Sequence, residues 1–191
     1  MSRSRQRFTR HLTTSCLAVL LAACGGGGQD ASTSGDVVGR TNATDATTDQ
    51  GCGIQGFADQ MLAEVNRVRA QGQQCGGSWR APVPALGWNT ALANAAAAHS
   101  TDMVTHNFVS HTGSDGSAVG DRAAAQGYTS GGVGENLGGG HKNIAHLMQG
   151  LLASPAHCEN LMRADYKSFG AACARSDATF YKRHWTQVFG Q

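Results

Sequence analysis

Four short segments in a fixed order constrain the fold of this 191-residue chain more than any other feature. They bring two imidazoles and a carboxylate, from three separate segments, into a region made largely of alanine, glycine and small polar residues. Each segment alone is weak evidence, because strings of three or four residues recur by chance. The specific signal is their order, with helical stretches of suitable length between them: Ser-His-Thr-Gly at 110–113, Gly-Glu-Asn at 134–136, Ser-Pro-Ala-His at 154–157 and Trp-Thr-Gln-Val-Phe-Gly at 185–190.

In this order the segments resemble those of the CAP superfamily, which includes cysteine-rich secretory proteins, insect venom antigens and plant pathogenesis-related proteins. The resemblance covers the chain from about Phe57 to Gly190 and is to the bacterial secreted branch. It implies the family's α-β-α sandwich, with a small antiparallel sheet flanked by helices. It does not by itself imply an enzymatic activity.

The N-terminus predicts export. Four arginines precede an apolar run at 12–21 that is too short for a permanent membrane span. The sequence Leu-Ala-Ala-Cys at 21–24 resembles the bacterial lipobox, which predicts a lipoprotein signal peptide over 1–23 and an acylated Cys24 at the mature N-terminus, anchored in a membrane. The alternative is an ordinary signal cut nearby, with Cys24 incidental. Gly25 resembles the outer-membrane sorting pattern, so we expect an outer-membrane or cell-surface lipoprotein, or a form released outside the cell.

The net charge of the precursor belongs to this signal. Four of the 15 Lys and Arg residues precede Cys24 and none of the 13 acidic residues does, so the remaining chain carries 11 basic and 13 acidic residues. Without a basic block or aromatic residues interleaved with lysines, the chain has no electrostatic signature for nucleic acid. We therefore expect no nucleic-acid partner.

The remaining chain divides into a linker and one domain. Residues 24–51 are rich in Gly, Ser, Thr and Asp with little to bury, which predicts a disordered tether. Residues 52–191 are of ordinary size for a single domain.

Four cysteines remain after Cys16 and Cys24 are set aside, and an even set in an exported chain predicts disulfides: Cys52, Cys75, Cys158 and Cys173. Four cysteines permit three connectivities. We predict pairing of Cys52 with Cys75 and of Cys158 with Cys173, because each pair brackets one local unit. The resemblance also places Cys158 on a helix and Cys173 on the neighbouring strand. The absence of Cys-x-x-Cys argues against a zinc ribbon or a thioredoxin-like site.

The hydrophobic pattern predicts an α+β fold. Apolar spacing indicates a helix over about 55–70, and Asn89 can cap an alanine-rich second helix that continues through Met103. Shorter helices are expected at 119–126 and 144–153, with Pro155 in the first turn of another. Alternating runs at 169–174 and 184–189 predict an antiparallel hairpin, and 134–138 a third strand.

Three residues carry the candidate chemistry. In the family, two histidines and two acidic residues line a central cleft, and the histidines can hold zinc or another divalent cation. The resemblance assigns these roles to His111, Glu135 and His157. The second acidic residue is missing, since 150–154 reads Gly-Leu-Leu-Ala-Ser, as is common in bacterial members. Each residue also has a purely structural alternative. His111 could be a hydrogen-bonded histidine in a loop, Glu135 could fix a turn by accepting backbone hydrogen bonds, and His157 could simply stand at the start of a helix.

The other histidines are not expected to be ligands. We expect His99 to pack on the second helix and His106 to lie near its end. His141, His146 and His184 are expected to be solvated or interfacial.

Two main functions follow. The first is a binding module for a lipid, another small apolar ligand or an envelope or extracellular protein, through a His- and Glu-lined cleft. The alternative is a metal-dependent hydrolase, in which water is polarised between His111 and His157 with Glu135 as general base. The chain has no Gly-x-Ser-x-Gly and no His-Glu-x-x-His motif, so this is the enzyme hypothesis that the sequence permits. An envelope or adhesion module without a small ligand also fits.

Overall fold

A computed structural model describes residues 50–191 of the chain. The predicted signal peptide, the acylated Cys24 and nearly all of the linker lie outside the described residues. The helices and strands follow in chain order: α1 (Phe57–Gln71), β1 (Gln73–Cys75), β2 (Ser78–Arg80), β3 (Gly87–Trp88), α2 (Thr90–His106), α3 (Val119–Ala125), β4 (Val133–Gly139), α4 (Ile144–Ala153), α5 (Pro155–Leu161), β5 (Ser168–Arg175) and β6 (Arg183–Gly190).

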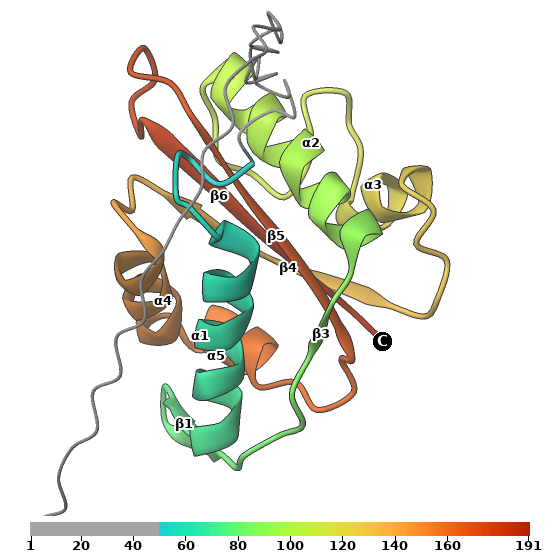
Figure 1. Ribbon diagram of the computed structural model, residues 1–191, viewed down its shortest axis with the longest axis vertical. Helices are drawn as coiled ribbons and strands as arrows, with labels where there is room; N and C mark the ends of the chain where they lie inside the picture. The colour runs from blue at the N-terminus through green and yellow to red at the C-terminus, as the bar shows by residue number, and fades with distance from the viewer. Residues whose placement is uncertain (1–49) are drawn as a thin grey trace, which may run out of the picture. The chain divides into compact units, whose positions relative to one another are not determined.

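The central sheet has the strand order β3-β5-β6-β4, so β4 is an edge strand. β5 and β6 form the predicted antiparallel hairpin, β4 pairs antiparallel with β6, and β3 pairs parallel with β5. Helices α2 and α3 lie on one side of this sheet, and α1, α4 and α5 lie on the other (Figure 1). The predicted α-β-α sandwich is confirmed. A separate two-stranded hairpin, β1-β2, follows α1.

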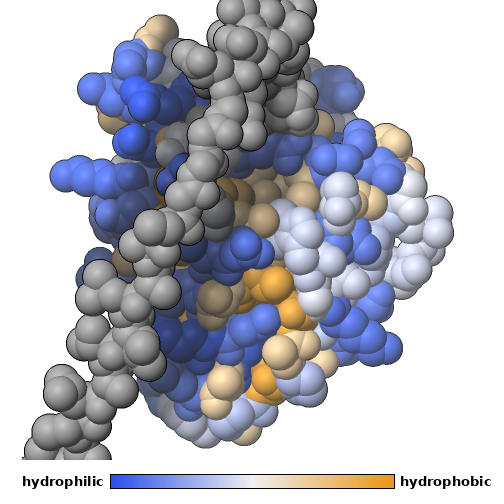
Figure 2. Space-filling model, in the orientation of Figure 1, coloured by the Kyte–Doolittle hydropathy of each residue, from blue (hydrophilic) through white to orange (hydrophobic). Residues whose placement is uncertain are grey.

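The strands bury both faces, and alternate residues contribute to two different cores. Along β5, Phe169, Ala171 and Cys173 belong to the core beneath α1, α4 and α5, whereas Ala172 belongs to the core beneath α2. Figure 2 shows that the viewed surface mixes hydrophilic and neutral residues, with the most strongly hydrophobic area beside α1. Among residues 50–191, none of the helices is long and apolar enough to cross a membrane.

Helix α2 lies very close to the sheet because both surfaces are made of small residues. Its buried side includes Ala93, Ala95 and Ala96, and it faces Gly170 of β5. A Cβ atom at position 170 would collide with the backbone of Leu92 and Ala93. The Asn89 side chain accepts a hydrogen bond from the backbone N–H of Leu92, which confirms the predicted cap.

The helix boundaries on the other side also follow local signals. The observed α4 has the predicted bounds, and Pro155 occupies the first turn of α5, where no backbone donor is needed. Helix α1 buries Phe57, Met61 and Val65 against the sheet.

The predicted disulfide pairing is wrong. The bridges join Cys52 to Cys173 and Cys75 to Cys158. Gly51 pairs with Cys173 in a β-bridge, and the Gln50 carbonyl accepts a hydrogen bond of 2.7 Å from the Cys173 amide, which brings the start of the domain beside β5. Each bridge therefore ties together segments that are distant in sequence. Two disulfides are typical of a protein exported to an oxidising compartment.

Candidate functional site

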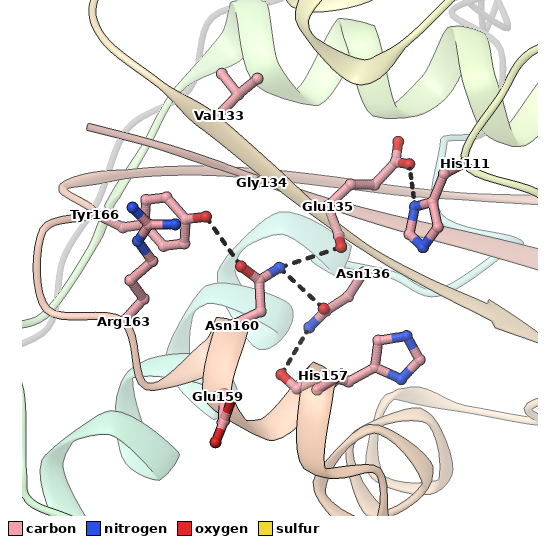
Figure 3. Close-up of a pocket in the computed structure, with 11 residues that line it drawn as sticks. His111, Val133, Gly134, Glu135, Asn136, His157, Glu159, Asn160, Arg163 and Tyr166 are labelled. Atoms are coloured by element: carbon pink, nitrogen blue, oxygen red, sulfur yellow. Dashed lines mark hydrogen bonds and ion pairs between the residues drawn. The ribbon is translucent and has the colours of Figure 1, made fainter.

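A polar cleft of about 540 Å³ opens at the free side of β4. Its walls come from three places: the loop between α2 and α3, the strand β4, and α5 with the segment that follows it (Figure 3). His111, Glu135 and His157, the three residues predicted from sequence, all line this cleft.

His111 is oriented by a buried carboxylate. Its Nδ1 lies 2.8 Å from Glu135 Oε1, and the Glu135 side chain is only 2% exposed whereas that of His111 is 62% exposed. Because a carboxylate accepts, the imidazole Nδ1 donates, and the lone pair of Nε2 is left free. This arrangement resembles the carboxylate–histidine pairs that orient metal ligands.

Glu135 is in turn held by Arg122, a residue that the sequence did not single out. Arg122 Nη2 donates to Glu135 Oε2 at 2.8 Å and to the His111 carbonyl at 3.1 Å, and both paired side chains are buried. Its Nη1 donates to the Ser117 carbonyl at 2.7 Å. Both Glu135 oxygens are thus engaged, so the geometry makes this carboxylate an orienting group for His111.

The loop that carries His111 is also fixed from α2. His99 is completely buried, and its Nε2 lies 2.8 Å from the Ser110 carbonyl. Burial lowers the pKa of His99, an effect that the charge of Glu135 opposes. The prediction that His99 packs on the second helix is confirmed.

An amide network holds α5 against the edge of β4. Asn160 Nδ2 donates to the Glu135 carbonyl at 3.1 Å and to Asn136 Oδ1 at 3.0 Å, and Asn136 Nδ2 donates to the His157 carbonyl at 3.3 Å. The Tyr166 hydroxyl donates to Asn160 Oδ1 at 2.9 Å (Figure 3). A side chain at Gly134 would collide with Tyr166, so this approach requires a glycine.

His157 faces the cleft from α5 and is half-buried. Burial lowers its pKa, and the nearby His111 lowers it further. Both effects favour the neutral imidazole, which is the form that binds a metal.

The cleft offers two imidazoles as possible ligands of a divalent cation, those of His111 and His157, and solvent or a ligand would have to complete its coordination. Among residues 50–191, no three His, Cys, Asp or Glu side chains are grouped to hold a metal ion. Glu159 lines the cleft from α5, but its carboxylate pairs with Arg80 at 2.6 Å and points away from the two histidines (Figure 3).

The other histidines lie elsewhere. His106 pairs with Asp102, and His146 is exposed near the start of α4. The expectation that His184 is solvated or interfacial is wrong, because His184 is completely buried and neither of its ring nitrogens has a hydrogen-bond partner in the described structure. Burial lowers its pKa.

The sequence matches the family model for the cysteine-rich secretory protein family, CAP, over residues 62–189. The chain belongs to the CAP family. The match contains all three cleft residues and both halves of the central hairpin. The CAP assignment thus rests on the region that builds the site.

Solved structures of bacterial proteins are similar to this CAP domain. An extracellular protein containing a SCP domain from Bacillus anthracis is 26% identical with a TM-score of 0.59, over 71% of this chain and 40% of that one. An outer surface protein from Borrelia burgdorferi is 16% identical with a TM-score of 0.59, over 70% of this chain and 90% of that one. The CAP chain therefore matches less than half of the Bacillus protein. No curated protein matches the sequence.

Proposed function

We propose that this CAP protein is an exported binding module that takes a polar ligand in the cleft between His111 and His157, with zinc or another divalent cation held by the two imidazoles. The observation that carries the proposal is the chain of contacts from buried Arg122 through Glu135 to His111. A buried ion pair that orients one exposed imidazole positions that group for a ligand.

The lining of the cleft favours a polar ligand over an acyl chain. Beside the two histidines it presents the side chains of Asn160, Arg163 and Tyr166. A lipid would need an apolar groove, and it remains an alternative ligand at another surface. An envelope or extracellular protein with a polar segment is a further candidate partner for the cleft.

The geometry favours binding over hydrolysis. A metal-dependent hydrolase would need Glu135 to accept a proton from water. Its two oxygens instead contact His111 and Arg122, and the side chain is almost completely shielded from solvent.

Zinc titration of the exported, purified protein tests the proposed cleft. We expect His111→Ala or His157→Ala to lower the affinity at least as much as the 10–100-fold loss that is typical when an orienting partner of a metal ligand is removed. Affinity should fall as the pH is lowered below about 6.5, the ordinary histidine value, because protonated imidazoles do not bind metal. The matched control is His146→Ala, which removes an exposed histidine outside the cleft. Equal zinc affinity of the wild type and of the variant that carries both His111→Ala and His157→Ala would refute the proposal.

The proposed location is a membrane surface, reached through an acylated Cys24. The similarity of this chain to an outer surface protein is consistent with this location. Mass spectrometry of the mature N-terminus tests it: an acylated Cys24 is expected, and an unmodified N-terminus would contradict it.

A further inference from the structure

A second surface of the domain, outside the cleft lining, exposes aromatic and basic side chains. It is the turn of residues 176–182 between β5 and β6, which we call the hairpin tip. Phe180 at this tip is 83% exposed, and Tyr181 beside it is 40% exposed. Their rings meet edge to face with centroids 5.0 Å apart.

The hairpin tip is held in place although Phe180 packs against little. The Phe180 amide donates to Asn107 Oδ1 at the end of α2 at 3.0 Å. The Ser176 amide donates to the Lys182 carbonyl at 2.9 Å, which closes the turn. Tyr181 lies against Gly139 of β4, where a Cβ atom would collide with its ring. The turn therefore presents an aromatic side chain to solvent from a fixed position.

Basic residues flank the two aromatic residues in the turn and on an adjoining connection. Arg175 and Lys182 are exposed at the ends of the turn, and Arg183 follows at the start of β6. Lys142 is exposed on the adjoining β4-α4 connection, which the hydrogen bond from the Gly140 amide to the Arg183 carbonyl holds beside the tip. The acidic residue of the turn, Asp177, is paired with Arg175 at 3.3 Å. The balance of charge is positive, although the chain after Cys24 has an excess of acidic residues.

The described chain also begins at this end of the domain. The carbonyl of Gln50 accepts a hydrogen bond from the Cys173 amide, and Cys173 lies two residues before Arg175 in β5. The segment that contains Cys24 therefore joins the domain close to the hairpin tip.

We propose that the hairpin tip docks on an anionic lipid bilayer, with Phe180 and Tyr181 at the interface and Lys142, Lys182 and Arg183 facing lipid phosphates. Aromatic rings settle at the level of the headgroups, and each basic residue near an anionic surface adds about 1 kcal/mol of attraction. Cys24 acylation, which belongs to the proposed function, would only raise the concentration of the domain at the membrane. The affinity of the tip for lipid does not depend on it.

Photo-crosslinking tests this docking with a matched position on the same chain. The full protein is exported, purified and mixed with vesicles of phosphatidylcholine, with or without phosphatidylglycerol. One sample carries p-benzoylphenylalanine in place of Phe180, and the other carries it in place of Trp79. Trp79 is also an exposed aromatic residue, at 61%, in the β1-β2 hairpin at the opposite end of the domain (Figure 1).

We expect lipid adducts at position 180 to exceed those at position 79 by at least fivefold in vesicles that contain phosphatidylglycerol. Lys182→Gln should lower the yield at position 180 about fivefold, the fold-change that corresponds to about 1 kcal/mol per charge. Equal yields at positions 180 and 79 would mean that the protein is tethered without docking, and would overturn the proposal. A yield that is independent of phosphatidylglycerol, or adducts formed only with protein, would overturn it as well. Acylation is read separately from the mass of the N-terminal peptide, so failure of the anchor and failure of the tip are distinguishable.

Discussion

The two faces of the central sheet are built in different ways. The face beneath α1, α4 and α5 is packed with large apolar side chains, among them Met61, Phe169 and Trp185, and both disulfides lie on this side. The face beneath α2 and α3 is richer in small residues such as Ala96 and Ala172, beside a few larger ones such as Leu92. It also buries polar groups: His99, Ser100, Arg122, His184 and Thr186. The first face buries polar groups as well, namely Arg69, Asn136 and Gln187, but no ion pair among the described residues.

This difference indicates that one face of the sheet mainly stabilises the domain, whereas the other face mainly positions the site. The first face gains stability from apolar burial and covalent links. The second face supplies the ion pair that orients His111. The cleft lies where the two faces meet at the edge of β4, because Glu135 and Asn136 are consecutive and point to opposite sides of the sheet. Glu135 contacts Arg122 of α3, and Asn136 contacts α5.

The largest effect is expected from opening the bridge between Cys52 and Cys173. The closed segment spans 121 residues, so the chain-entropy model assigns about 5 kcal/mol to this link. Replacing both cysteines by alanine should lower the free energy of unfolding by this order, as measured by urea denaturation. The Cys75/Cys158 double variant is the companion, with a separation of 83 residues and a slightly smaller expected loss. A loss below about 1 kcal/mol in both variants would contradict the assigned role of the bridges.

The second prediction concerns the polar face. Arg122→Leu leaves the buried Glu135 carboxylate without its cation, which should lower the free energy of unfolding by about 3–5 kcal/mol. Adding Glu135→Gln should restore part of this loss, and a double-mutant cycle measures how much. Arg80→Leu breaks a pair whose side chains are 45% and 47% exposed, so it should change stability by no more than about 1 kcal/mol. Equal losses of stability in the Arg122 and Arg80 variants would contradict the claim that the buried ion pair matters more than the exposed one.

A smaller effect should appear as the pH is lowered. Burial lowers the pKa of His99 and of His184, so the unfolded chain takes up protons before the folded one does. The contribution of these two neutral histidines to the free energy of unfolding is fully present above about pH 6.5, the ordinary histidine pKa. It should be lost progressively as the pH falls below that value. Urea denaturation across this range measures the slope. His184→Leu should make the slope shallower, whereas His146→Ala, at an exposed position, should leave it unchanged.

The helices and the hairpin could be predicted from the sequence because their signals are local, whereas the three cleft residues came from the resemblance to the CAP family. Asn89 and Pro155 mark helix starts by chemistry that acts within one turn. Arg122 and Asn160 could not be found in this way, since their partner Glu135 lies 13 and 25 residues away along the chain. The disulfide pairing failed for the same reason. The burial of His184 was missed because β6 is a central strand covered on both faces, so alternation does not tell inside from outside.

The most direct test of the account is nitrogen-15 NMR of the histidine rings during a zinc titration. The contact with Glu135 predicts that neutral His111 carries its proton on Nδ1. Zinc should then shift Nε2 of His111 and a ring nitrogen of His157 together, at the same metal concentration, because the two faces of the sheet contribute to one site. A shift at His111 alone, or shifts at His106 and His146 with the cleft pair unchanged, would contradict it.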